Sequence, residues 1–220
     1  MTMRPMHMHR AQNGISLLEL SISLALSAMV ALLLLRQQSD DIRYAHLKNE
    51  SRWVVGVLAD IQQNKGSSPN FASLSDYTLG AIRSVPAAYL TVDVTGTTVV
   101  NGFGGNVHVG PLSLGGGSSN AYALNYTSVP RDVCARLVVL INETAKADAP
   151  LYGMVGDMGV TPGVPSTIGL NADGSVFASG LNQKVLKSLS SAELNMETVG
   201  EFCNSDSTKP LRSLTLIRWP

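Results

Sequence analysis

The sequence predicts an α+β fold in which a long N-terminal helix packs on an antiparallel β-sheet head that carries additional short helices. The first observation is an apolar run, Ile15 to Leu35, that continues into a segment with little to stop a helix. The second is a series of short downstream segments whose alternating apolar residues are typical of strands. The third is a helical segment, Arg131 to about Lys146, lying between those strands. This order of elements favours the α+β class.

The composition indicates a folded protein of modest size. The chain has 220 residues, a formal net charge of zero, 45% hydrophobic residues and 15% charged residues. This apolar content excludes a disordered chain. Beyond the long helix about 150 residues remain, which is the size of one globular domain. No basic patch stands out beyond the termini, so direct binding of nucleic acid is not expected.

One helix is predicted from Ile15 to about Asn64, roughly 75 Å long at 1.5 Å per residue. From Arg36 to Asn64 the chain has no proline and a single glycine, and Lys65-Gly66-Ser67-Ser68-Pro69 ends the helix. The second half is amphipathic. Its apolar stripe is predicted to contain Ile42, Ala45, Trp53, Val54, Val57, Leu58 and Ile61. The charged residues expected outside the stripe are Arg43, Lys48, Glu50 and Arg52.

The apolar run follows Gly14 directly and contains one charged residue, Glu19. Its 21 residues are about enough to cross the hydrocarbon core of a bilayer. A carboxylate in such a segment costs about 2.5–3.5 kcal/mol on insertion scales, so Glu19 predicts a function. Basic residues in the leader, Met1–Gly14, orient the helix with its N-terminus in the cytoplasm.

Two other interpretations of this run stay open. A secretory signal peptide is cut after its apolar stretch, and the nearest small-x-small site is Ala25-Leu26-Ser27. Cutting there would leave a second apolar block, Met29 to Leu35, at the new N-terminus and would give Glu19 no purpose. A plain membrane anchor would leave both Gly14 and Glu19 unexplained.

Short strands and helices are predicted along the rest of the chain. The expected strands are Tyr89–Val94, Thr98–Val100, Asn106–Val109, Tyr122–Tyr126, Thr167–Leu170, Val176–Ala178 and Leu211–Trp219. A short helix is expected from Ser191 to Phe202, and Asn171-Ala172-Asp173-Gly174 is a hairpin turn signal. The regions 66–120 and 150–180 are predicted to be rich in loops and are candidates for exposure.

The two cysteines, Cys134 and Cys203, lie in the part of the chain that would be exported. An even count outside the cytoplasm indicates one disulfide. It would close a loop of about 70 residues, worth at most about 4 kcal/mol by chain entropy. Two buried free thiols are the alternative. A metal site is disfavoured because no second Cys or His lies at ligand spacing from either cysteine.

Motifs for catalysis or cofactor binding are missing from the sequence. His46 and His108 stand alone, and no nucleophile-elbow, Walker or dinucleotide motif occurs. His7 and His9 lie in a leader too short to predict a metal site. The sequence therefore predicts a non-enzymatic protein without cofactor or metal.

The segment Asn13-Gly14-Ile15-Ser16-Leu17-Leu18-Glu19-Leu20 resembles the processing site of type IV prepilins. The resemblance implies that prepilin peptidase cuts after Gly14 and methylates the new amine of Ile15, and that Glu19 guides filament assembly. Many family members have Phe or Met where this chain has Ile15, which is also apolar, so processing is still expected. The implied divisions are a leader, 1–14, a long helix, 15–64, with 15–35 in the membrane or filament core, and a head, 65–220.

Several downstream segments resemble the type IVb branch of this family and its PilS-like members. They are Phe103-Gly104-Gly105-Asn106-Val107, Tyr122-Ala123-Leu124-Asn125-Tyr126, Val129-Pro130 followed shortly by Cys134, and Cys203-Asn204. The resemblance implies the type IV pilin fold and a structural subunit of an extracellular fibre for adhesion, cell contact or conjugative mating. The implied partners are other copies of the chain, prepilin peptidase and an inner-membrane assembly platform. The precursor would lie in the bacterial inner membrane and the assembled subunit at the cell surface.

Two rival functions share part of this evidence. A minor pilin or a secretion-system pseudopilin would have the same first 50 residues or so. A membrane-anchored periplasmic enzyme or binding protein would leave Gly14 and Glu19 unexplained.

Overall fold

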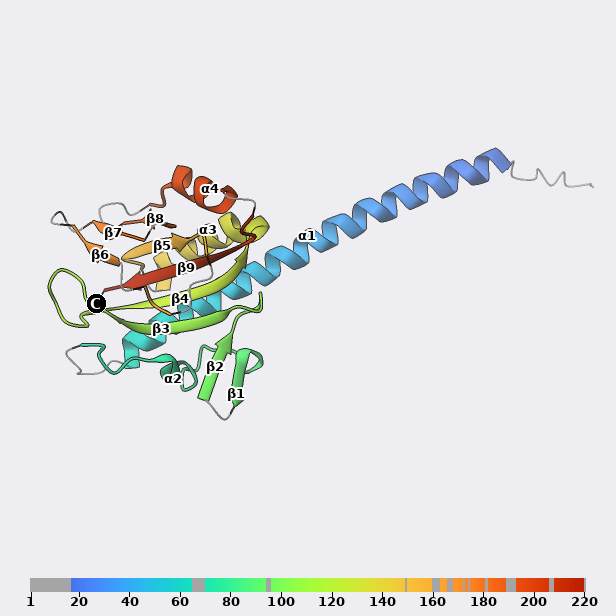
Figure 1. Cartoon of the computed structure of the whole chain (residues 1–220). Coiled ribbons are helices and arrows are strands. Elements are labelled where there is room, and N and C mark those ends of the chain that lie inside the picture. Colours follow the sequence, from blue (N-terminus) through green and yellow to red (C-terminus); the bar gives the residue numbers. More distant parts are fainter. Residues whose placement is uncertain are drawn as a thin grey trace, which may run out of the picture. The chain divides into compact units, whose positions relative to one another are not determined.

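The computed structural model describes residues 17–64, 70–93, 96–148, 150–159, 163–165, 168–171, 173, 175–180, 182–188, 193–205 and 208–219. The chain divides into two compact units, Met1–Tyr44 and Ala45–Pro220. The helix α1 (Leu17–Asn64) contributes to both units, whereas the sheets and the other helices belong to the second (Figure 1).

The helix α1 ends at Asn64, which confirms the end predicted from the breakers that follow. Within the first unit, the large apolar side chains between Leu17 and Leu35 are each more than half exposed. Within the second unit, α1 buries one face. The buried residues are Leu47, Glu50, Ser51, Trp53, Val54, Val55, Val57, Leu58 and Ile61.

The predicted stripe on α1 is wrong at three positions. Ile42 and Ala45 are exposed, so the buried face begins at Leu47, and Glu50 is buried rather than outside the stripe. The physical reason lies in the helical spacing. Glu50 is three residues after Leu47 and four before Val54, which places it in the middle of the buried face.

The head contains an antiparallel sheet whose strands differ in length. Across the sheet, its seven strands are β1 (Leu90–Asp93), β2 (Gly96–Val100), β3 (Asn106–Leu112), β4 (Ala121–Pro130), β9 (Leu211–Arg218), β5 (Gly153–Asp157) and β8 (Gln183–Lys187). A separate antiparallel hairpin pairs β6 (Ile168–Leu170) with β7 (Val176–Ala178). The other helices are α2 (Asp76–Leu79), the short 3₁₀-helix η1 (Ala87–Tyr89), α3 (Arg131–Asp148) and α4 (Met196–Asn204).

The sheet separates two apolar clusters because side chains on a strand alternate between its faces. On β4, Tyr122, Leu124 and Tyr126 pack in the larger cluster with residues of α1, α3 and α4. Ala121 and Ala123 of the same strand pack in the smaller cluster with residues of β6 and β7. The centre of the sheet is therefore covered on both faces, which fits the burial of nearly all of β4 and β9.

Several strand predictions are confirmed, and others fail for a recognisable reason. The prediction of exposed loops over 150–180 is wrong for β5, which is buried at every residue between β9 and β8. The sequence of β5, Gly153 to Asp157, has two glycines and no alternation, so strand propensity alone does not identify it. The prediction of exposure over 66–120 is likewise wrong for β3, which is largely buried, whereas the strand predicted at Leu211–Trp219 is confirmed as β9.

Candidate functional site

The N-terminal part of α1 presents an apolar surface. This helix is long and apolar enough to cross a membrane, since an 18-residue window within it has a mean hydropathy of 2.2. None of that window is buried. Ser21, Ser23 and Ser27 each donate a hydroxyl hydrogen bond to a backbone carbonyl one turn earlier. These bonds satisfy the hydroxyls within the helix itself, so the serines add little polarity to its surface.

Glu19 lies in the first turn of α1 and is exposed. A carboxylate near a helix N-terminus is favoured there by the helix dipole. Gly14 and Ile15, the predicted processing residues, lie outside the described residues. The predicted roles of Gly14, Ile15 and Glu19 therefore stay predictions.

One buried polar group of the second unit is the carboxylate of Glu50 on α1, which is 0% exposed. It accepts a hydrogen bond of 2.9 Å from the Trp53 indole N–H and further bonds from the hydroxyls of Tyr89 and Tyr126. We call these four residues the Glu50 cluster. Because Tyr89 ends η1 and Tyr126 lies on β4, the carboxylate joins α1 to two other parts of the head.

Burial and the Glu50 carboxylate together raise the pKa of both tyrosines. Burial, together with the hydrogen bond to Glu50 and its negative charge, raises the pKa of Tyr89 to about 12. Deeper burial and the same carboxylate raise the pKa of Tyr126 well above its ordinary value. A phenolate beside a buried carboxylate would place two negative charges together, so the fold keeps both hydroxyls protonated as donors.

Two further residues border the Glu50 cluster. His46 is 42% exposed and its Nε2 lies 3.8 Å from Glu50 Oε1, and its ring meets that of Phe103 edge-on. A Cβ atom at Gly102 would lie 2.2 Å from Glu50 Oε1 and 2.7 Å from His46 Nε2. Glycine at 102 therefore allows the loop after β2 to close over the carboxylate.

His108, which stands alone in the sequence, also contacts a carboxylate. Its Nδ1 lies 2.7 Å from Asp76 Oδ2, and Asp76 Oδ1 accepts a bond from the Val109 N–H. Partial burial raises the pKa of Asp76, but the bonds to His108 and Val109 together lower it by more than burial raises it. The pKa of Asp76 is therefore below its ordinary value. These contacts join α2 to β3. Among the described residues, no group of three or more His, Cys, Asp or Glu side chains is placed to hold a metal ion.

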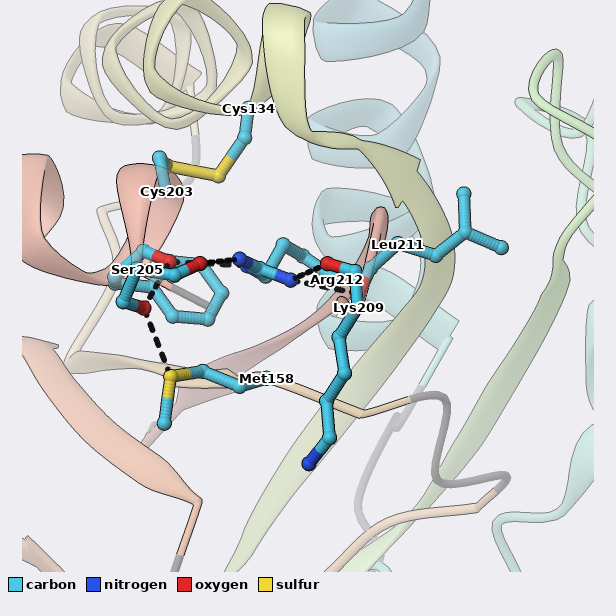
Figure 2. The surroundings of a disulfide bond; sticks show 8 residues. Cys134, Met158, Cys203, Ser205, Lys209, Leu211 and Arg212 are labelled. Carbon is cyan, nitrogen blue, oxygen red and sulfur yellow. Dashed lines mark hydrogen bonds between the residues drawn. A yellow bond between two sulfur atoms is a disulfide. The ribbon is translucent and has the colours of Figure 1, made fainter. Parts of the chain in front are cut away.

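The structure contains the disulfide predicted between Cys134 and Cys203. The bond joins the first turn of α3 to the end of α4, and the two Cα atoms lie 5.6 Å apart (Figure 2). Both cysteines are buried. The alternative of two free thiols is thereby excluded for this structure.

Sequence reasoning missed Glu50 and also Arg212 on β9. The signal for Glu50 is its phase, since it lies on the same helical face as Leu47, Val54 and Ile61 and three residues before Trp53. Arg212 gives no comparable signal, because its partners are backbone carbonyls that the sequence does not reveal.

These features define a class of structural protein: a helix with an uncovered apolar surface, and a disulfide-bonded α+β head whose buried polar groups fix its elements together. Residues 46–148 match the protein-family model described as PilS N terminal. This stretch of the chain is therefore similar to the N-terminal domain of the PilS pilins. This match confirms the resemblance predicted from the sequence.

Solved structures similar to this chain include two type IV pilins. One is a type IV b pilin from Salmonella typhi, with 16% identity, coverage of 80% of this chain and 97% of that chain, and a TM-score of 0.47. The other is TcpA, a type IV pilin from the Vibrio cholerae El Tor biotype, with 14% identity, coverage of 79% and 99%, and a TM-score of 0.48. No curated protein matches the sequence significantly.

Proposed function

We propose that this chain is a subunit of a type IVb pilus that polymerises through α1 into an extracellular fibre. The observation that carries the proposal is the apolar surface of α1 from Leu17 to Leu35, exposed in its own unit, on a chain whose residues 46–148 match the PilS N-terminal family model. Such a surface needs either a bilayer or the helices of other subunits to cover it. A fibre subunit uses both in turn, the membrane before assembly and other copies of the chain afterwards.

The proposal includes processing of the N-terminus. Prepilin peptidase would cut after Gly14 at the cytoplasmic face of the inner membrane and methylate the amine of Ile15. The remaining helix, 15–64, and head, 65–220, would then pass to an inner-membrane assembly platform. Intact-mass measurement of the mature chain is expected to show loss of residues 1–14 and one added methyl group. A mature chain that keeps Met1 would contradict this step.

Glu19 is proposed to select the register of the fibre. In a packed bundle of helices that excludes water, its carboxylate would pair with the methylated amine of Ile15 on a neighbouring subunit. Removing one member of a buried ion pair costs about 3–5 kcal/mol, which favours one axial register over the others.

This role is tested by Glu19→Ala in a strain that makes the fibre. Processing is expected to continue while fibres are lost. Asp40→Ala is a matched control, because Asp40 is an exposed carboxylate on the same helix beyond the apolar run. Normal fibres from Glu19→Ala, or equal losses from both variants, would show that Glu19 has no special role.

The biological use of the fibre is proposed to be attachment, contact between cells or conjugative mating. The alternative is that the chain is a minor pilin or a secretion-system pseudopilin, which would share the same long helix. The abundance of the chain in purified fibres separates these assignments, because a major subunit would dominate the fibre and a minor one would not.

A further inference from the structure

The disulfide is surrounded by contacts that do not involve sulfur. Arg212, the second residue of β9, is 0% exposed although it carries a charge. Its guanidinium donates hydrogen bonds to the carbonyls of Phe202 and Ser205 at the end of α4, to that of Lys209 just before β9 and to that of Leu211, the first residue of β9. Figure 2 shows Arg212 lying between Ser205 on one side and Lys209 and Leu211 on the other, below the disulfide.

These bonds hold the residues on both sides of Cys203. Phe202 precedes Cys203 directly, and Ser205 follows it by two positions. The carbonyls at the end of a helix lack partners within the helix, and a cation is favoured beside them. The guanidinium also lies 5.9 Å from the centre of the Phe202 ring. One buried side chain on β9 therefore fixes the end of α4.

A second arginine makes a similar contact from the other helix. Arg131, the first residue of α3, donates a hydrogen bond to the carbonyl of Asn204, and its backbone N–H donates to the carbonyl of Pro210 over 3.0 Å. Arg131 lies three residues before Cys134. The ends of α3 and α4 that carry the cysteines are thus joined to the same connection between α4 and β9.

We propose that Arg212 is a positioning residue for formation of the disulfide, because it docks the end of α4 on the sheet and so presents Cys203 to Cys134 before the bond exists. Disulfide formation takes two steps when an external disulfide is the oxidant. One cysteine thiolate attacks the external disulfide and releases a thiolate. The second cysteine thiolate then attacks the mixed disulfide, forms the Cys134–Cys203 bond and releases a second thiolate, so the two electrons reside on the reduced oxidant.

Because the cysteines are buried, we expect Arg212 to act in the second step, in which the second thiolate attacks the mixed disulfide. Cys134 is 0% and Cys203 is 1% exposed, so an oxidant reaches either sulfur only while α4 is displaced. The closing step requires α4 to return to its docked position. Hydrogen bonds from a charged donor are stronger than neutral ones, so their loss is expected to slow closing by at least about tenfold.

The first experiment measures the closing step. The full chain, purified in detergent with both thiols reduced, is mixed with glutathione disulfide, quenched by alkylation and analysed by mass spectrometry. Wild type is expected to close with little mixed disulfide, whereas Arg212→Met and Arg212→Lys accumulate it, since lysine lacks the planar fork of donors. Arg218→Met is the control, because Arg218 lies on the same strand but donates to the carbonyl of Pro150. Closing of Arg212→Met at the wild-type rate would overturn the proposal.

A second experiment leaves Arg212 in place and asks whether α4 docks on the sheet without the disulfide. It tests the proposal even if the arginine variants fail to fold. In the variant Cys134→Ala with Cys203→Ala, hydrogen exchange of the amides in α4 is measured in the full chain. Protection of α4 close to that of the oxidised wild type is expected if Arg212 docks the helix without the disulfide. Exchange of α4 at the rate of an open chain would show that the disulfide itself positions the helix, and would overturn the proposal.

Discussion

At the scale of single residues, the buried carboxylate of Glu50 is a contact that joins three elements. Its acceptor oxygens satisfy an indole N–H and two phenolic hydroxyls from three different elements. A buried polar group without a partner costs about 1–3 kcal/mol, so one side chain here affects several such groups together. Glu50 thus has a structural reason for its burial that is independent of any ligand.

We expect Glu50→Ala to lower the free energy of unfolding by roughly 3 kcal/mol or more, because it leaves the donors of Trp53, Tyr89 and Tyr126 without an acceptor. Glu50→Gln keeps one acceptor oxygen and is expected to cost less. Chemical denaturation of the full chain in detergent, followed by tryptophan fluorescence, measures both. Glu143→Ala is the control, since Glu143 is 59% exposed on α3. An effect of Glu50→Ala no larger than that of the control would contradict this role.

The same cluster predicts how stability falls in alkaline solution. The pKa of Tyr89 rises from 10.0 to about 12 on folding. A pKa raised on folding adds stability that is complete below the unfolded pKa and is lost as pH rises through the folded one. Stability is therefore expected to fall between about pH 10 and pH 12, measured by phenolate absorbance and circular dichroism. In Glu50→Gln the fall is expected to be shallower but not absent, because burial, the larger cause, is kept. Phenolate absorbance at pH 10 equal to that of the unfolded chain would refute the account.

At the scale of elements, the packing of α4 on β5 depends on a missing side chain. A Cβ atom at Gly156 of β5 would lie 2.6–2.8 Å from ring atoms of Phe202 on α4. Phe202 is fully buried and makes up part of the larger apolar cluster. Gly156 is one of the two glycines that make β5 hard to predict from the sequence, and it is also the residue that lets α4 approach the sheet.

Gly156→Ala is expected to destabilise the head by about 1–3 kcal/mol, because the new methyl group overlaps the Phe202 ring. Adding Phe202→Leu should recover part of the loss. Gly200→Ala is the matched control, since Gly200 lies within α4 and a Cβ atom there would meet nothing within 4 Å. That control is expected to be neutral or to stabilise by up to about 1 kcal/mol through helix propensity. Thermal unfolding of the three variants tests this, and equal effects at 156 and 200 would disprove the packing argument.

Elements with a strong local signal were predictable, whereas those decided by distant contacts were not. The end of α1, the start of α3 after Pro130 and the antiparallel pairing of β6 with β7 follow from breakers, periodicity and a turn signal. By contrast, β5 and β8 have no alternation that marks them as strands. Their places in the sheet depend on partners distant in the sequence, because β5 pairs with β9 and β8 pairs with β5. Glu50 was misplaced for a related reason: charge predicts exposure unless the partners, here Tyr89 and Tyr126, are known.

At the scale of the whole molecule, the two units have different tasks in the proposed fibre. The unit Met1–Tyr44 contains the exposed apolar part of α1, which other copies of the chain would cover. The unit Ala45–Pro220 has its own apolar core, the Glu50 cluster and the disulfide. Because these contacts all lie within one chain, we expect the head to fold before the fibre forms.

The central claim is that the processed chain builds a fibre. Electron microscopy of material sheared from cells that express the chain, with mass spectrometry of the fibre subunit, tests it most directly. We expect thin fibres whose dominant component is this chain, beginning at a methylated Ile15 and carrying an intact Cys134–Cys203 bond. Fibres made of another protein with this chain as a trace component would instead indicate a minor subunit. An unprocessed chain that stays in the membrane without fibres would contradict the account.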